Sequence, residues 1–121
     1  SMDTHKDIAI LSVAESIVEK PLRIEFPRSS IDVGSSVGYC GYPNRRDLSC
    51  FVGMISGFPR GYINMHSYAF GGASGSLVVD RSGKAIGVLS AIEVGEFFGL
   101  PTPLESVVWI VPIDESSLSS I

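Results

Sequence analysis

One serine, Ser74, lies in a segment whose residue types fit nucleophilic chemistry. Residues 71–75 (GGASG) contain three glycines and no bulky side chain, and they run directly into the apolar residues 77–79. Glycine permits positive φ and lets a ligand approach the backbone closely. A flexible linker can share this composition, but the apolar run is followed by a turn at 81–83 and a second apolar run over 84–90, which predict two strands. Such a loop would hold a hydroxyl beside backbone N–H groups, the arrangement that stabilises an oxyanion in acyl transfer.

The overall composition favours one all-β domain. The chain has 121 residues, 45% of them hydrophobic, with 13 Gly and 7 Pro. Apolar segments with frequent breakers are more typical of strands than of helices. The net charge is −4 and no basic cluster exceeds Arg45-Arg46, so we expect no nucleic-acid partner. The apolar runs are shorter than the roughly 20 residues that a membrane helix needs, so we expect no membrane partner.

The two cysteines, Cys40 and Cys50, flank an expected turn at 43–46 and could face each other across two strands. Two cysteines are too few for a zinc site or a disulfide scaffold, so we expect neither a metal nor another cofactor. Free thiols in a reducing, intracellular compartment are the favoured interpretation, and a disulfide is the alternative.

Hydrophobic periodicity indicates a series of short strands separated by Gly- and Pro-containing turns. We expect a strand buried on both faces over 7–13, a half-exposed strand over 22–26 within a polar connector, and an acidic, proline-punctuated loop over 93–106. The remaining strands are expected at 37–43, 48–56, 62–69, 77–80, 84–90 and 107–112. In the strand over 48–56, Phe51, Gly53 and Ile55 share one face, and Val52 and Met54 share the other. This spacing is typical of a small antiparallel barrel or sandwich.

Several short pieces, in this order along the chain, resemble the trypsin-like serine peptidases, most closely the HtrA/Deg-type branch. They are residues 7–11 (DIAIL), 41–43 (GYP), 53–57 (GMISG), 72–76 (GASGS), 87–90 (GVLS) and 110–112 (IVP). The resemblance covers nearly the whole chain. It implies an antiparallel Greek-key β-barrel of the trypsin-like type, with this chain carrying the last strand of a first barrel and the whole second barrel.

The resemblance also implies a role for each matching residue. Ser74 corresponds to the nucleophile, and the backbone N–H groups of Gly72 and Ser74 correspond to the oxyanion hole. Asp7 corresponds to the carboxylate that orients the catalytic base, and Ser90 to the support for that carboxylate. From the sequence alone, Asp7 also fits an ordinary residue at the start of a strand. A serine hydroxyl is a poor nucleophile until a base takes its proton, so a base is needed as well.

The chain departs from the family's pattern at the catalytic base. The family order is His, then Asp, then Ser, so a histidine is expected well upstream of Asp7. His5 is only two residues before Asp7, and we interpret it as an exposed terminal residue. His66 lies eight residues before Ser74 and cannot be the family's base, so we expect a packed or solvated side chain, or one that lines the substrate pocket. Leu77 replaces the proline that is usual in the family.

These departures favour a truncated chain. Ser1 and Met2 resemble the remnant of a tag, so we expect the natural protein to extend upstream. The expected units are the end of a first barrel at 1–13, an inter-barrel connector at 14–34, the second barrel at 35–113 and a tail at 114–121. Without the catalytic histidine this chain should be inert. Loss of the first barrel should leave apolar surface exposed near 8–13, through which a homodimer could form.

Tyr68, Ser90 and Ile92 fall where the family lines its substrate pocket, while Phe97 or Phe98 could line the pocket or belong to the core. None of these side chains is acidic, so we expect a protein or peptide substrate with an apolar or small P1 residue. Two functions follow from the sequence. The first is a portion of a serine endopeptidase, and the second is a catalytically inactive peptidase-like module used for binding or structure.

Overall fold

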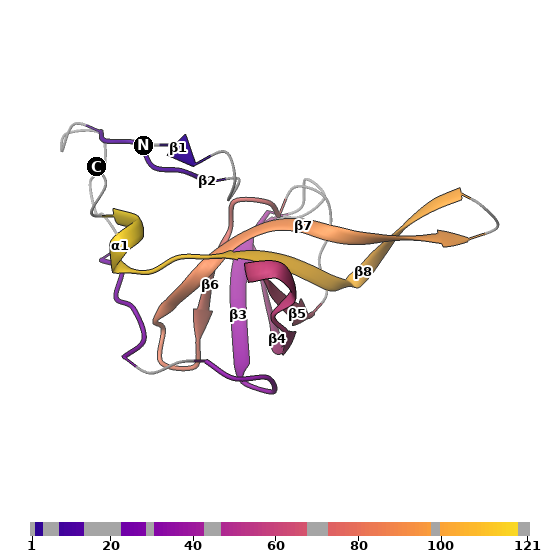
Figure 1. Ribbon diagram of the computed structural model, residues 1–121, viewed down its shortest axis with the longest axis horizontal. Coiled ribbons are helices and arrows are strands. Elements are labelled where there is room, and N and C mark those ends of the chain that lie inside the picture. Colours follow the sequence, from indigo (N-terminus) through magenta and orange to yellow (C-terminus); the bar gives the residue numbers. More distant parts are fainter. Residues whose placement is uncertain are drawn as a thin grey trace.

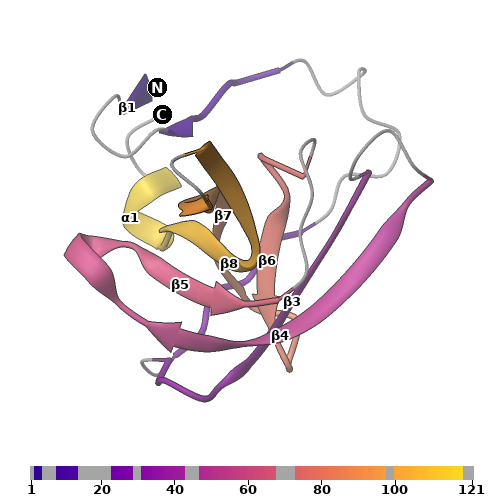
Figure 2. The ribbon, with the colours of Figure 1, turned by 90° about the vertical axis from the view of Figure 1, so that its right-hand side faces the viewer.

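The computed structural model describes residues 2–3, 8–13, 23–28, 31–42, 47–67, 73–97 and 100–118. Six strands close into an antiparallel barrel in the order β3-β4-β5-β8-β7-β6 (Figures 1 and 2). They are β3 (Ser36–Gly41), β4 (Ser49–Gly57), β5 (Ile63–His66), β6 (Leu77–Asp80), β7 (Ala85–Phe97) and β8 (Leu100–Pro112). The expected all-β barrel is confirmed.

Short elements complete the described part of the chain. Strands β1 (Met2–Asp3) and β2 (Ile8–Ala9) form a separate antiparallel pair. A 3-10 turn, η3 (Pro59–Gly61), joins β4 to β5, and the helix α1 (Glu115–Leu118) follows β8. No helix among the described residues is long and apolar enough to cross a membrane.

The barrel interior is filled by alternate residues of its strands, as the period of two requires. These buried side chains are Val37, Tyr39, Ile55, Ile63, Met65, Val78, Leu89, Val108 and Ile110. On β4, Ile55 is fully buried, whereas Val52 is 80% exposed and Met54 is 50% exposed. The expected division of this strand between an inner and an outer face is therefore confirmed.

The strand order explains where Ser74 lies. Strand β5 lies between β4 and β8, whereas β6 lies between β3 and β7. The chain therefore crosses from one side of the barrel to the other between His66 and Leu77. Ser74 lies near the end of this crossover, immediately before β6.

The structure corrects three of the expected elements. Residues 93–97 and 100–106 are strand and not loop, because β7 and β8 continue as a paired ribbon from Glu93↔Leu104 to Phe97↔Leu100. Residues 23–28 contain no strand. Of residues 8–13, only Ile8 and Ala9 form a strand, and Leu11 and Val13 are 79% and 61% exposed, so burial on both faces is wrong here. Their exposure does agree with the apolar surface expected near 8–13.

Residues 23–28 are attached to the barrel at the β6–β7 hairpin. The Ala85 N–H donates to the Glu25 carbonyl at 2.7 Å, and the Lys84 ammonium forms an ion pair with the Glu25 carboxylate. The hydrogen bond from Lys84, together with its positive charge, holds the pKa of Glu25 below its ordinary value. Both carboxylate and ammonium remain partly or largely exposed, so we expect this ion pair to add little stability.

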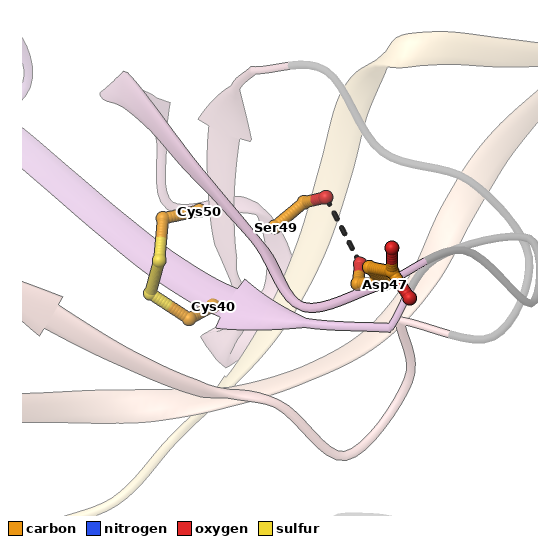
Figure 3. Close-up of a disulfide and its surroundings, with 4 residues drawn as sticks. All are labelled: Cys40, Asp47, Ser49 and Cys50. Carbon is orange, nitrogen blue, oxygen red and sulfur yellow. Dashed lines mark hydrogen bonds between the residues drawn. A yellow bond between two sulfur atoms is a disulfide. The ribbon is translucent and has the colours of Figure 1, made fainter.

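A disulfide joins Cys40 of β3 to Cys50 of β4 (Figure 3). The two residues are direct partners in the antiparallel register, with their Cα atoms 4.0 Å apart. The favoured interpretation of free thiols is wrong, and the alternative, a disulfide, is confirmed. The sequence placed the cysteines near each other, but only the register of β3 against β4 brings them opposite one another.

Removing the disulfide with the double substitution Cys40→Ser and Cys50→Ser should lower the free energy of unfolding by about 2–3 kcal/mol. The bridge closes a loop with a sequence separation of 10, and closing it restricts the unfolded chain. Urea denaturation measures the change. Reduced wild-type protein is the matched control and should show the same loss. Equal stability of the oxidised wild type and the double variant would contradict the prediction.

Candidate active site

Ser74 occupies the corner of a tight turn. The Ser76 N–H donates to the Ala73 carbonyl at 3.1 Å, and Gly75 has φ +90°. A positive φ at the third of four residues is the signature of a type II turn, in which glycine is preferred at that position. Ala73 is fully buried while Ser74 is exposed. The turn therefore directs the serine outward and anchors the residue before it in the core.

Backbone hydrogen bonds attach this turn to β7. The Gly75 N–H donates to the Leu89 carbonyl at 2.7 Å, and the Leu89 N–H donates to the Ser76 carbonyl at 2.9 Å. They extend the β6–β7 ladder past its last registered pair, Leu77↔Val88. Ser74 is therefore carried by backbone that is part of the sheet.

The end of β3 packs against the other side of the turn. A Cβ placed on Gly41 would lie 2.6 Å from Ser76 Oγ, so a larger residue at position 41 would require the Ser76 hydroxyl to adopt another rotamer. The sequence marked Gly41 as part of a matching piece but did not reveal this contact. A glycine within a strand is the signal that could have found it.

Ser90 presents its backbone carbonyl to the candidate nucleophile. The β7–β8 register shifts between Leu89 and Ala91, which marks a β-bulge at Ser90. Bulges redirect backbone groups and are common beside active sites. The Ser74 hydroxyl donates to the Ser90 carbonyl at 3.0 Å. A carbonyl oxygen is far too weak a base to take the proton, so this bond orients the hydroxyl without activating it.

The structure brings Ser74 and Ser90 together, and it places Ile92 farther along β7, opposite Val108. The other predicted site residues, Asp7, Gly72, Tyr68 and Phe98, lie outside the described residues, as does His5. His66 is exposed on β5, where it pairs with Met54 and Val107, in agreement with a solvated side chain. Within the described ranges, no group of three or more His, Cys, Asp or Glu could hold a metal ion.

Comparison with known families identifies the class of protein. The model of the trypsin-like peptidase domain matches residues 1–88, so the chain belongs to the trypsin-like peptidase family. The resemblance found in the sequence is thereby confirmed. No curated protein sequence matches the chain significantly.

Solved structures of trypsin-like and HtrA-type proteases share the fold. The inactive form of a serine-to-alanine mutant of Rv3671c from M. tuberculosis aligns with 84% of this chain, at 15% identity and a TM-score of 0.64. The HtrA-type protease AlgW, a variant in complex with a decapeptide, aligns with 80% of it at 21% identity and a TM-score of 0.62. The aligned regions span only 54% of Rv3671c and 30% of AlgW.

Proposed function

We propose that this chain is the nucleophile-bearing portion of a serine endopeptidase, with Ser74 as the nucleophile. The observation that carries the proposal is an exposed hydroxyl on a turn bonded to the sheet at both Gly75 and Ser76. Precise placement of a reacting group is worth several orders of magnitude in rate, and a turn within a β ladder provides it. Membership of the trypsin-like peptidase family supports the same assignment.

The proposed reaction is hydrolysis of a peptide bond through an acyl-enzyme. Ser74 Oγ attacks the scissile carbonyl while a base removes the hydroxyl proton, and the same base then protonates the leaving amine. The backbone N–H groups of Gly72 and Ser74 are proposed to stabilise the oxyanion. Asp7 is proposed to hold the base in the correct tautomer, and Ser90 to support Asp7.

In this chain the Ser74 hydroxyl donates to a backbone carbonyl and not to a base. We propose that a histidine supplied by sequence upstream of Asp7 in the full-length protein takes over this hydrogen bond, and that the chain as given is inert. Residues 1–13 would then end a first barrel, and residues 35–113 would be the second. Packing of that first barrel would cover the exposed side chains of Leu11 and Val13.

The proposed substrate is a protein or peptide with an apolar or small P1 residue, accommodated by Tyr68, Ser90 and Ile92. A peptide ligand is supported by the related structure of AlgW, which contains a decapeptide. The second candidate function is a catalytically inactive peptidase-like binding module. The bond from Ser74 to the Ser90 carbonyl favours it, because a hydroxyl held there is not activated.

A fluorophosphonate probe distinguishes the two functions. The full-length protein should be labelled covalently, and the substitution Ser74→Ala should abolish labelling, because the probe reacts only with an activated serine. The matched control is Ser82→Ala, which removes an exposed serine from the β6–β7 turn and should leave labelling unchanged. Labelling that survives Ser74→Ala would place the nucleophile elsewhere. A full-length protein that is folded but never labelled would favour the binding module.

A further inference from the structure

The disulfide between Cys40 and Cys50 lies on the outer face of the barrel, where a reductant can reach it. Both cysteines are exposed, and Figure 3 shows the bridge spanning β3 and β4. The lining of a groove of about 510 Å³ includes both cysteines together with Gly38, Val52, Leu77 and Val79. Because thiol–disulfide exchange requires a thiolate to approach a sulfur atom, exposed disulfides are generally the reducible ones.

The bridge fixes an end of β3 that is paired on one side only. The registered pairs of β3 with β6 end at Tyr39, whereas those with β4 continue through Cys40 to Gly41. The last two residues of β3 are therefore held in register by β4 alone. The disulfide is the covalent part of this attachment, and it limits how far β3 and β4 can separate at this end.

The same end of β3 lies against the turn that carries Ser74. Gly41 is buried, and a Cβ placed on it would be 2.6 Å from Ser76 Oγ, so the strand and the turn are in contact here. The backbone of Ser76 bonds to Ala73 within the turn and to Leu89 on β7. A change in how firmly the end of β3 is held therefore acts on the packing of the Ser74 turn.

We propose that the Cys40–Cys50 disulfide is a thiol-exchange site, that a dithiol reduces it in the folded protein, and that its reduction loosens the turn carrying Ser74. A thiolate of the reductant attacks one sulfur of the bridge, which forms a mixed disulfide and releases the other cysteine as a thiolate. The second thiol of the reductant then displaces the first cysteine. The reductant leaves as a disulfide, and the protein has gained two electrons and two protons, all supplied by the reductant.

The first measurement is whether the bridge is reduced without unfolding. The full-length protein is incubated with dithiothreitol in native buffer, free thiols are trapped with a maleimide, and peptide mapping locates the modified cysteines. Both Cys40 and Cys50 should be modified, equally fast with and without urea below the unfolding transition, since an exposed bridge needs no opening of the fold. A bridge that is reduced only under unfolding conditions would overturn the proposal. Reduction by thioredoxin as well would extend the site to a protein-borne dithiol.

The second measurement compares hydrogen exchange at the two ends of β6. The Gly75 N–H bonds to Leu89 beside the turn, and the Asp80 N–H bonds to Lys84 at the opposite end. Reduction should speed exchange of the Gly75 amide about tenfold more than that of the Asp80 amide, because local loosening raises exchange only where it occurs. A general loss of stability would speed both amides alike. Equal changes at the two ends would therefore contradict the proposal.

The matched control is the full-length double variant Cys40→Ser with Cys50→Ser, which keeps both strands and lacks the bridge. Its exchange pattern should resemble that of the reduced wild type and should not respond to dithiothreitol. Reoxidation should return the wild type to its original pattern. A response of the double variant to the reductant would show that the effect arises elsewhere in the protein, and the assignment to this bridge would then be wrong.

The consequence for reactivity rests on the proposed function of Ser74. Reduction should slow labelling by the fluorophosphonate probe about tenfold, because reactivity depends on placement of the reacting group to within about 1 Å. Labelling at the same rate before and after reduction would break the link between the bridge and the serine. Failure of the proposed function has a different signature. The oxidised wild type would then not be labelled at all, while reduction of the bridge and the difference between the Gly75 and Asp80 amides would remain.

Discussion

Replacing Gly53 with alanine should lower the free energy of unfolding by about 3 kcal/mol, at the upper end of what overpacking usually costs. A Cβ at this position would lie 2.0 Å from the His66 carbonyl oxygen and 2.7 Å from Ser67 Cβ. The nearest atom is backbone of the neighbouring strand, so the clash cannot be relieved by a side-chain rotation. Strand β4 would have to separate from β5, which breaks the barrel close to the start of the crossover that carries Ser74.

The matched control is Gly57→Ala on the same strand. A Cβ on Gly57 meets no atom within 4 Å, and this glycine does not have the positive φ that would strain an alanine. Its stability should stay within about 0.5 kcal/mol of the wild type, as for most surface substitutions. Urea denaturation of the three proteins measures the difference. A similar midpoint for Gly53→Ala and the wild type would show that β4 and β5 are less tightly packed than the structure has them.

Local pattern was sufficient to predict most of the barrel. Alternation places Ile55 inside and Val52 outside, and both assignments are correct because a strand with one buried face has a period of two. The paired ribbon of residues 93–97 and 100–106 was not predicted, because its local pattern contains prolines. Pro101 and Pro103 are breakers in any local pattern, yet both are accommodated on β8, which has no described partner on its outer edge there.

The sequence could not predict which distant segments pair or in which register they do so. Cys40 and Cys50 form a disulfide because their strands pair in the register that makes them direct partners. A shift of one residue would have turned one of them to the other face. The sequence pattern predicted that Leu11 and Val13 are buried, but both side chains are exposed. Hydrophobicity indicates that a side chain favours burial, but it does not identify the segment that would bury it.

The candidate site likewise has one feature that the local sequence predicted and one that depends on pairing between distant segments. The glycines around Ser74 predicted an exposed hydroxyl on a tight loop, and the type II turn has the positive φ at Gly75 that such a loop needs. The contact between Ser74 and the Ser90 carbonyl was not predicted. It depends on a bulge at Ser90, and the bulge is set by how β7 registers against β8, far from Ser74 in sequence.

The turn at Ser74 leads to a prediction that separates catalytic positioning from stability. In the full-length protein, Gly75→Ala should slow labelling of Ser74 by the fluorophosphonate probe about 100-fold, because a displacement of about 1 Å at a reacting group has effects of this size. Alanine disfavours φ +90°, so the substitution should distort the turn and move the serine from its place beside β7. The prediction rests on the proposed role of Ser74.

The control is Gly83→Ala, in the turn between β6 and β7. Gly83 has φ +81°, and neither a Cβ on Gly75 nor one on Gly83 meets any atom within 4 Å, so both substitutions introduce backbone strain alone. Each should cost about 1 kcal/mol in the free energy of unfolding. Only Gly75→Ala should slow labelling, because Gly83 lies at the far end of β6 from Ser74. If the two variants were labelled at the same rate, the geometry of the turn at Gly75 would not be what positions the serine.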